Sequence, residues 1–355
     1  AIKNAIFYYF LIIMKKKFFK FIKYALPLII TIYLLVAFIP RTYDVPQSQT
    51  IQGTQYWDLV TGSKIGYTLI PSKSAKKPFP IIYLHGGPGG FISNRNIKNL
   101  SQLSEDGYDV YLYDQIGSGQ SERLTNINEY TADRHKKDLE EIIKKIAAEK
   151  VILIGQSWGA ILATLFVANN PDKVERIILI GPGSIQPMRE EQLHAYPPDS
   201  LNLKKPSYSN REANEKCQSL RSKAITFWAK KFGRKLASDK EVDDFQTYLN
   251  GELNKATVCD TSLALKAEGG GGFYAQIMTA QSFNSIQDTR PKLKDSKIPI
   301  LIMKGQCDNQ PWGFTNEYLE LFKNHQLKII PNAGHSISVE QPELYLKTIR
   351  VFLNQ

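Results

Sequence analysis

Acidic residues are absent from the first 41 positions of this sequence, and their absence accounts for most of its net charge. The whole chain of 355 residues carries 45 Lys and Arg against 34 Asp and Glu, a formal net charge of +11. Seven of the basic residues lie in the acid-free segment, which leaves 38 basic against 34 acidic side chains elsewhere. A net charge of +4 on the body gives little support for a nucleic-acid-binding surface. We therefore expect no nucleic-acid partner.

Cysteine is also scarce, with three residues at positions 217, 259 and 307. They form no CxxC pair and no Cys/His cluster at zinc spacing, so we expect no zinc site built from them. In an oxidising compartment Cys217 and Cys259 can pair and leave Cys307 free, although spacing alone does not establish the connectivity. Hydrophobic residues at 43% and charged residues at 22% exclude a disordered or fibrous chain.

The acid-free segment, residues 1–41, has the pattern of a signal peptide or signal anchor. Lysines at positions 15–17, 20 and 23 precede an uncharged apolar stretch of 16 residues, Tyr24–Ile39. A membrane-spanning helix needs about 20 apolar residues, and the nearest lysines can snorkel to lengthen the buried span. The lysine-rich side should stay in the cytoplasm and place the rest of the chain outside it.

Three interpretations of this segment compete. A cleaved signal peptide needs small residues at its cleavage site, and Val36–Pro40 offers no clean small-x-small pattern, which favours an uncleaved anchor. A buried amino-terminal helix of the globular domain would have to bury the lysine cluster, which is unfavourable. Because the sequence begins at Ala1, Met14 is a candidate for the true start, with residues 1–13 an upstream extension or a misassigned start.

After residue 55, short apolar runs alternate with amphipathic stretches. The runs predicted as strands are Lys64–Ile70, Ile81–Leu84, Asp109–Tyr113, Val151–Ile154, Arg176–Ile180, Ile300–Met303 and Leu327–Ile330. The stretches predicted as helices are Asp133–Glu149, Trp158–Asn169, Gly313–Lys323 and Pro342–Asn354. Continuous apolar strands that alternate with helices indicate the α/β class, with a mostly parallel sheet covered on both faces.

The alternation stops between residues 184 and 290. This polar stretch contains helical patterns at Arg211–Phe232 and Glu241–Leu253 and little strand signal. We expect a helical cap over the carboxyl edge of the sheet, inserted into a core of residues 42–183 and 291–355. Its glycine run, 269–272, follows no strand and precedes no Lys-Ser/Thr pair, so a hinge is favoured over a phosphate-binding loop.

The strongest local signal is Gly155-Gln-Ser157-Trp-Gly159, which follows an apolar strand and precedes a helix pattern. A G-x-S-x-G sequence in that context indicates a nucleophile elbow, a sharp turn that projects the serine hydroxyl above the sheet. A serine hydroxyl is a weak nucleophile and needs a positioned base. Asp308 and His335 follow the last two predicted strands, in the order acid then histidine that this arrangement requires. They are therefore predicted to complete a triad with Ser157, and chemistry of this kind requires neither a metal nor an organic cofactor.

A glycine-rich loop, His85-Gly-Gly-Pro-Gly-Gly90, follows another predicted strand. Backbone N–H groups must approach a substrate oxyanion closely, and glycines leave room for that approach. Gly87 and the residue after the nucleophile, Trp158, are the predicted oxyanion-hole donors. His85 is interpreted as a structural residue that holds the turn, and Asp114 as part of a second tight turn.

Together these motifs resemble the α/β-hydrolase superfamily and, within it, the proline iminopeptidase-like group. The group's HGGPGG, DQ-x-G-x-G-x-S and G-x-SWG motifs stand here at His85–Gly90, Asp114–Ser121 and Gly155–Gly159, and Ile116 stands where the group has arginine. The resemblance implies a serine hydrolase with an α/β-hydrolase fold, acting as an aminopeptidase on short peptides. It also implies a cap glutamate that holds the substrate's amino terminus, for which Glu268 is the candidate.

Two rival functions stand beside this one. A carboxylesterase of the same fold uses the same triad without an amine clamp, and a binding protein can keep the fold without catalysis. The expected partner is a small molecule or short peptide, and the expected membrane contact is through the amino-terminal segment.

Overall fold

The computed structural model describes residues 2–355, with side chains from Met14 onward. An eight-stranded sheet lies at its centre, in the order β1-β2-β4-β3-β5-β6-β7-β8. Strands β3 to β8 pair in parallel, whereas β1 and β2 form an antiparallel edge. The strands are β1 (Gln55–Asp58), β2 (Lys64–Ile70), β3 (Ile81–Leu84), β4 (Val110–Tyr113), β5 (Val151–Gln156), β6 (Val174–Ile180), β7 (Ile300–Gly305) and β8 (His325–Ile330). The predicted fold class, a mostly parallel α/β sheet, is confirmed.

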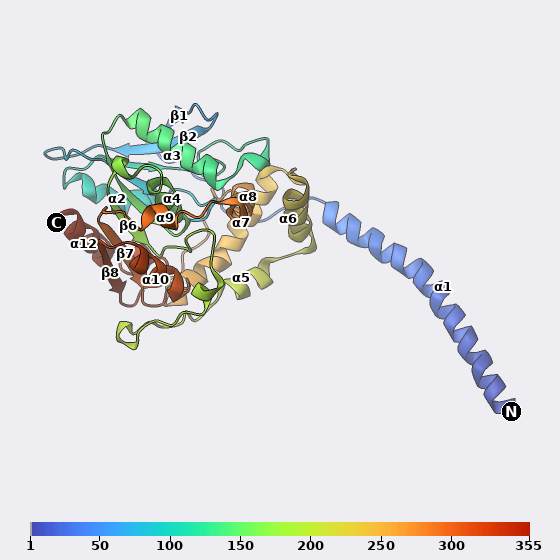
Figure 1. The fold of residues 1–355 in the computed structure, drawn as a ribbon. Helices are drawn as coiled ribbons and strands as arrows, with labels where there is room; N and C mark the ends of the chain where they lie inside the picture. The colour runs from blue at the N-terminus through green and yellow to red at the C-terminus, as the bar shows by residue number, and fades with distance from the viewer. Residues whose placement is uncertain (1) are drawn as a thin grey trace.

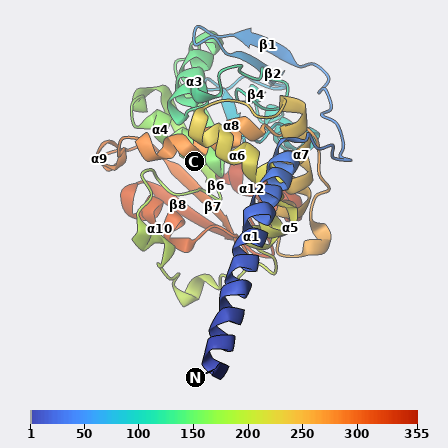
Figure 2. The same ribbon diagram turned by 90° about the vertical axis from the view of Figure 1, so that its right-hand side faces the viewer.

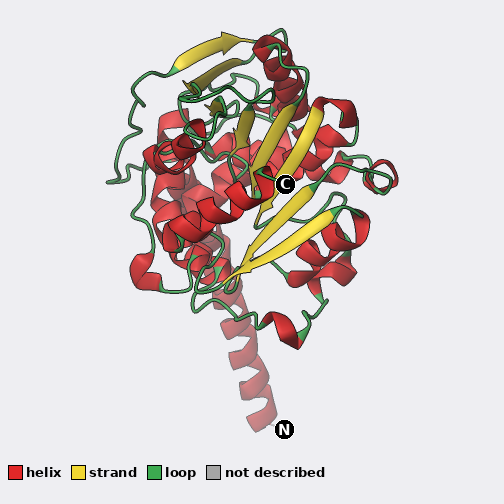
Figure 3. Cartoon of the chain, turned by 90° about the vertical axis from the view of Figure 1, so that its left-hand side faces the viewer, coloured by secondary structure: helices red, strands yellow, loops and turns green. Residues whose placement is uncertain are grey.

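Both faces of the sheet are buried, which explains why its strands are continuously apolar. Along β5, Leu153 joins one core cluster, while Ile152 and Ile154 join the other, because successive side chains of a strand point to opposite faces. Figure 3 shows helices on both sides of the strands. The helices around the sheet are α2 (Asn94–Leu100), α3 (Ala132–Ile146), α4 (Trp158–Val167), α10 (Trp312–Leu321), α11 (Ile337–Glu340) and α12 (Pro342–Leu353).

Between β6 and β7 the chain leaves the sheet and forms a mostly helical insertion. Its helices are α5 (Asn210–Cys217), α6 (Leu220–Phe232), α7 (Asp239–Leu253), α8 (Phe273–Ser282) and α9 (Arg290–Leu293). The single helix expected over Arg211–Phe232 is in fact two. Gln218 is extended, and the Ser219 hydroxyl accepts a hydrogen bond from the Ser222 N–H, which starts a new helix with a capping box.

Short 3₁₀ helices complete the connections. They are η1 (Ser101–Ser104), η2 (Ile127–Glu129), η3 (Pro171–Lys173), η4 (Glu190–Leu193), η5 (Asp199–Leu201), η6 (Asn254–Thr257), η7 (Thr261–Leu263) and η8 (Phe283–Ser285).

The glycine run 269–272 is buried and tightly packed, which does not fit the hinge expected from the sequence. The Gly272 N–H donates to the carbonyl oxygen of Gly89 at 2.8 Å. A Cβ at Gly272 would lie only 1.8 Å from the carbonyl oxygen of Gly117. Glycine is therefore required here for the close approach of three backbone segments, not for freedom of movement.

The amino-terminal helix α1 (Ile2–Phe38) extends away from the body as one long rod (Figures 1 and 2). Its segment Met14–Phe38 has 25 residues and a mean hydropathy of 2.1, which makes it a candidate membrane span. At about 1.5 Å per residue this segment is about 38 Å long, more than the hydrocarbon core of a bilayer. Large apolar side chains such as Phe19 and Leu28 are exposed along it, and no other part of the described chain covers them.

Candidate active site

Ser157 occupies a sharp turn between β5 and α4. β5 ends one residue before it and α4 begins one residue after it. Its backbone has φ 53° and ψ −113°, in a region that non-glycine residues rarely adopt. The Ser157 N–H donates to the carbonyl oxygen of Ile180 at 2.9 Å, which ties the turn to β6. A Cβ at Gly159 would lie 2.0 Å from the carbonyl oxygen of Leu84, so the turn depends on a glycine there.

His335 and Asp308 form a buried pair beyond the carboxyl ends of β8 and β7. His335 Nδ1 donates to Asp308 Oδ1 at 2.9 Å, and the N–H of Gln310 donates to the same oxygen at 2.9 Å. Gly181, with φ of 50°, lies against this pair. A Cβ at Gly181 would lie 2.7 Å from His335 Nδ1, so a side chain at this position would displace the imidazole.

A buried lysine that was not predicted as a site residue lies beside Asp308. Lys304 Nζ is 3.3 Å from Asp308 Oδ2 and donates to the carbonyl oxygen of Gln310 at 2.9 Å. Burial raises the pKa of Asp308, but the Lys304 cation and His335 more than offset that effect and hold the pKa well below its usual range. The available signal was a lysine inside the apolar strand Ile300–Gly305, because a charge buried in a strand needs a partner.

Ser157 and His335 line the same cavity, which has a volume of about 500 Å³. Gly87 lines it from the glycine-rich loop, and Glu268, an exposed residue, lines it from the insertion. Within residues 14–355 the Ser157 hydroxyl forms no hydrogen bond with His335, whose Nδ1 is used by Asp308. Catalytic hydrogen bonds often become short and aligned only when substrate is bound, so this geometry is compatible with a triad.

The glycine-rich loop passes directly over Ser157. A Cβ at Gly86 would lie 3.3 Å from the Cβ of Ser157. Within residues 14–355, no hydrogen bond from the backbone N–H groups of Gly87 and Trp158 is found. Two unused backbone donors beside a serine are what an oxyanion hole requires.

His85, which begins this loop, is held in a buried hydrogen-bond network. Its Nδ1–H donates to the carbonyl oxygen of Gly86 at 2.8 Å, and its Nε2 accepts from the Gln115 N–H at 2.9 Å. Burial lowers the pKa of His85 to about 4, although the bond to Gly86 opposes that effect, so the ring is neutral. The Trp158 indole donates to the Gln115 side chain at 2.7 Å, which joins the loop to α4. These contacts are those of a structural residue.

Asp114 has a similar role in the neighbouring turn. Its carboxylate accepts hydrogen bonds from the N–H groups of Ile92 at 2.7 Å and Gln120 at 2.8 Å. Burial raises the pKa of Asp114 to about 6, against the effect of these bonds. The carboxylate therefore holds two loops near the cavity, but burial of its charged form lowers the stability of the protein at neutral pH.

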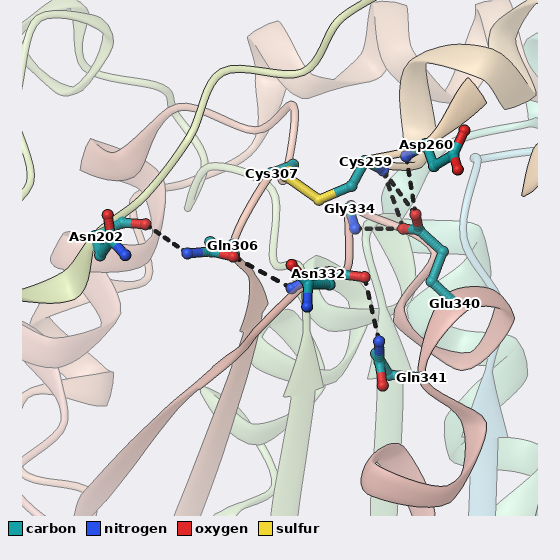
Figure 4. Close-up of a disulfide and its surroundings, with 9 residues drawn as sticks. All are labelled: Asn202, Cys259, Asp260, Gln306, Cys307, Asn332, Gly334, Glu340 and Gln341. Carbon is teal, nitrogen blue, oxygen red and sulfur yellow. Dashed lines mark hydrogen bonds between the residues drawn. A yellow bond between two sulfur atoms is a disulfide. The ribbon is translucent and has the colours of Figure 1, made fainter. Parts of the chain in front are cut away.

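The cysteine pairing considered from the sequence was wrong. Cys259 is bonded to Cys307 (Figure 4), and Cys217 is a buried free thiol in α5. The two bonded residues are 48 positions apart and their Cα atoms lie 5.3 Å apart. The disulfide joins the insertion to the residue directly before Asp308. Spacing along the chain could not reveal this pairing, because the three-dimensional fold decides which cysteines meet.

The Glu340 carboxylate, also drawn in Figure 4, joins the insertion to the loop that carries His335. It accepts N–H hydrogen bonds from Cys259 at 2.9 Å and Asp260 at 3.1 Å on the insertion side. On the other side it accepts one from Gly334 at 2.6 Å. Nothing in the sequence pointed to Glu340, because two of its three partners lie about 80 residues away.

Residues 80–342 match the family model described as alpha/beta hydrolase fold. The chain belongs to the alpha/beta hydrolase fold family. Among curated members, the proline iminopeptidase of Heyndrickxia coagulans is 26% identical over 302 residues, covering 83% of this chain and 96% of the relative. That of Lactobacillus helveticus is 34% identical over 131 residues, covering 36% of this chain and 44% of the relative.

Solved structures of other hydrolases share the fold. The esterase EaEST from Exiguobacterium antarcticum superposes with a TM-score of 0.57 at 20% identity, over 85% of this chain and 99% of that chain. The proline iminopeptidase of Mycobacterium smegmatis superposes with a TM-score of 0.55 at 18% identity, over 85% of this chain and 98% of that chain. This esterase and this peptidase thus resemble the chain about equally in fold.

Proposed function

We propose that this chain is a serine hydrolase in which Ser157, His335 and Asp308 form the catalytic triad, and that it removes amino-terminal proline from short peptides. One observation carries the proposal: Ser157, on its sharp turn, and His335, which is paired with Asp308, line the same cavity. The curated relatives named proline iminopeptidase support the choice of substrate.

The proposed reaction gives each of these groups one role. Ser157 Oγ attacks the substrate carbonyl, while His335 Nε2 accepts the hydroxyl proton and then gives it to the leaving amine. Asp308 accepts the Nδ1–H bond, so it holds the imidazole in the tautomer whose Nε2 can accept a proton. The N–H groups of Gly87 and Trp158 stabilise the oxyanion, and water then hydrolyses the acyl ester on Ser157.

We propose further that residues 184–290 form a cap that determines substrate choice. Leu249 and Leu253 of α7 line the cavity and offer apolar contacts to a proline ring. Glu268 lines the same cavity and supplies the carboxylate that a substrate's amino terminus needs to offset its lost hydration.

We also propose that α1 anchors the enzyme in a membrane, with the catalytic part outside the cytoplasm. The span Met14–Phe38 is long and apolar enough, and its lysine-rich end favours the cytoplasmic side. The Cys259–Cys307 disulfide supports this location, because disulfides persist mainly in oxidising compartments.

A substrate panel tests the function. Proline p-nitroanilide should be hydrolysed, and Ser157→Ala should abolish both that activity and labelling by a fluorophosphonate probe. Glu268→Gln should raise KM for proline p-nitroanilide and leave hydrolysis of p-nitrophenyl acetate unchanged, because an ester has no ammonium group to hold. Glu190→Gln, an exposed glutamate in η4 away from the cavity lining, is the matched control.

The alternatives give different results in the same panel. Activity on esters alone would replace the aminopeptidase by a carboxylesterase, the function favoured by the esterase among the similar structures. Folded wild-type protein that hydrolyses nothing and takes up no fluorophosphonate would be a binding protein, and the hydrolase proposal would be wrong.

A further inference from the structure

The outer surface of α6 carries exposed apolar and basic side chains in a single stripe. These residues recur every three or four positions, as one face of a helix requires: Leu220, Lys223, Phe227, Lys230 and Lys231. We call this set the α6 outer face. Phe227 is 61% exposed, and the neighbouring Phe232 is 50% exposed. Neighbouring aromatic side chains that are both exposed form an apolar patch, and such patches often mark an interaction surface.

The α6 outer face carries positive charge without compensation. No acidic residue occurs between Lys216 and Ser238. Within residues 14–355, Lys223, Lys230 and Lys231 form no ion pair. Aromatic rings beside lysine side chains are typical of protein surfaces that bind an anionic membrane.

α6 lies at the point where α1 leaves the body, as Figures 1 and 2 both show. The Phe38 ring packs edge to face against Trp228, with ring centroids 6.0 Å apart. The buried Arg221 donates to the carbonyl oxygen of Ala37 at 2.8 Å and is itself held by Glu241 at 2.8 Å. The end of α1 is therefore fixed on α6 and does not swing freely beside it.

This contact determines what the α6 outer face meets when α1 spans a bilayer. The span ends at Phe38, so Phe38 and the Trp228 ring against it lie at the membrane–water boundary. The Phe232 ring lies 4.6 Å from the Trp228 ring, and the Phe227 ring lies 6.2 Å from the Phe232 ring, centroid to centroid. Aromatic rings prefer that boundary, and lysine side chains beside it reach the lipid phosphates.

We propose that the α6 outer face is a membrane-binding surface that lies on the non-cytoplasmic surface of the bilayer spanned by α1, with Phe227 among the headgroups and Lys230 and Lys231 on lipid phosphates. This inference rests on the proposed anchorage by α1. The span α1 in the bilayer and the α6 outer face on its surface would together fix the orientation of the hydrolase body on the membrane.

A site-specific fluorescent label tests the proposal in the full chain. Phe227→Cys, labelled with the environment-sensitive dye NBD, is reconstituted in vesicles of phosphatidylcholine and phosphatidylglycerol that contain a nitroxide-labelled lipid. The matched control is Val351→Cys, an exposed position on α12, which lies on the opposite side of the body from α1 in Figure 1. Exposed substitutions of this kind change stability little, and hydrolase activity confirms folding.

The NBD label at position 227 should be quenched several-fold more strongly than the label at position 351 in the same vesicles. Lys230→Glu combined with Lys231→Glu should reduce that quenching, because repulsion from phosphatidylglycerol lifts the face off the lipid. If the protein floats with the vesicles and resists carbonate extraction, yet position 227 is quenched no more than position 351, the membrane-binding surface is refuted and the anchor stands. If the protein does not float at all, the anchorage fails and this inference fails with it.

Discussion

Gly181 is not a predicted site residue, yet the geometry makes it the most informative position to change. It lies directly after β6, with φ of 50°, and its α-carbon faces the His335–Asp308 pair. In Gly181→Ala the new methyl group would lie 2.7 Å from His335 Nδ1 and 2.9 Å from His335 Cε1. Carbon and nitrogen atoms in ordinary contact are about 3.5 Å apart or more, so the ring must move by roughly 1 Å.

Two separate costs follow from this substitution. A displacement of about 1 Å in a catalytic group lowers the rate by about 10²-fold, so kcat/KM of Gly181→Ala should fall by about that factor. A left-handed backbone costs a non-glycine residue about 1–2 kcal/mol, so the free energy of unfolding should fall by about that amount. The loss of activity should thus exceed what modest destabilisation explains.

Gly53→Ala separates the two costs. Gly53 has φ of 84°, and a Cβ there meets no atom within 4 Å, so alanine imposes the backbone cost without a collision. Steady-state kinetics on the best substrate of the panel and urea denaturation are measured for both variants. Gly53→Ala should be destabilised but fully active. If Gly181→Ala retains kcat/KM within about threefold of the wild type, the imidazole seen here is not the catalytic base.

Three further predictions concern stability. Replacing both Cys259 and Cys307 by serine should lower the free energy of unfolding in urea by about 4 kcal/mol, the chain-entropy value for a separation of 48 residues. Lys304→Met should cost about 3–5 kcal/mol at neutral pH. The pKa of Asp308 is depressed, so the stability that its charged form contributes is lost as pH falls. The difference in unfolding free energy between the wild type and Lys304→Met should therefore shrink below about pH 4, as measured by urea denaturation. Burial raises the pKa of Asp114 to about 6, so wild-type stability should fall by roughly 2–3 kcal/mol as pH rises from about 4 through 6. In Asp114→Asn this decrease in stability between about pH 4 and 6 should be absent. If the variant shows the same pH dependence as the wild type, the raised pKa of Asp114 is wrong.

The strands and the order of the candidate site residues were predictable because their signals are local. β2 and β3 begin and end at the predicted residues, since each apolar run is bounded by polar residues or proline. The other predicted strands and core helices are present with ends shifted by at most three residues. Ser157, Asp308 and His335 each directly follow or closely follow a strand, and parallel strands bring such positions to one edge of a sheet.

What the sequence did not reveal depends on non-local contacts. β1 (Gln55–Asp58) is mostly exposed and has no apolar pattern, because only pairing with β2 makes it a strand. α8 has no side-chain cap at its start, where Gly272 stands. The α6 outer face could be seen as a helical pattern, but its proximity to the end of α1 required the folded structure.

The position of the disulfide changes how the insertion should be understood. An insertion that only covered the sheet could open and close without affecting the triad candidates. Here Cys259 is covalently bound to the residue before Asp308, and the same segment shares Glu340 with the loop before His335. The carboxyl-terminal part of the insertion and the loops that carry Asp308 and His335 are therefore tied together. If the proposed triad is correct, we expect substrate to enter past other parts of the insertion, because a movement at Cys259 would pull Asp308 away from His335.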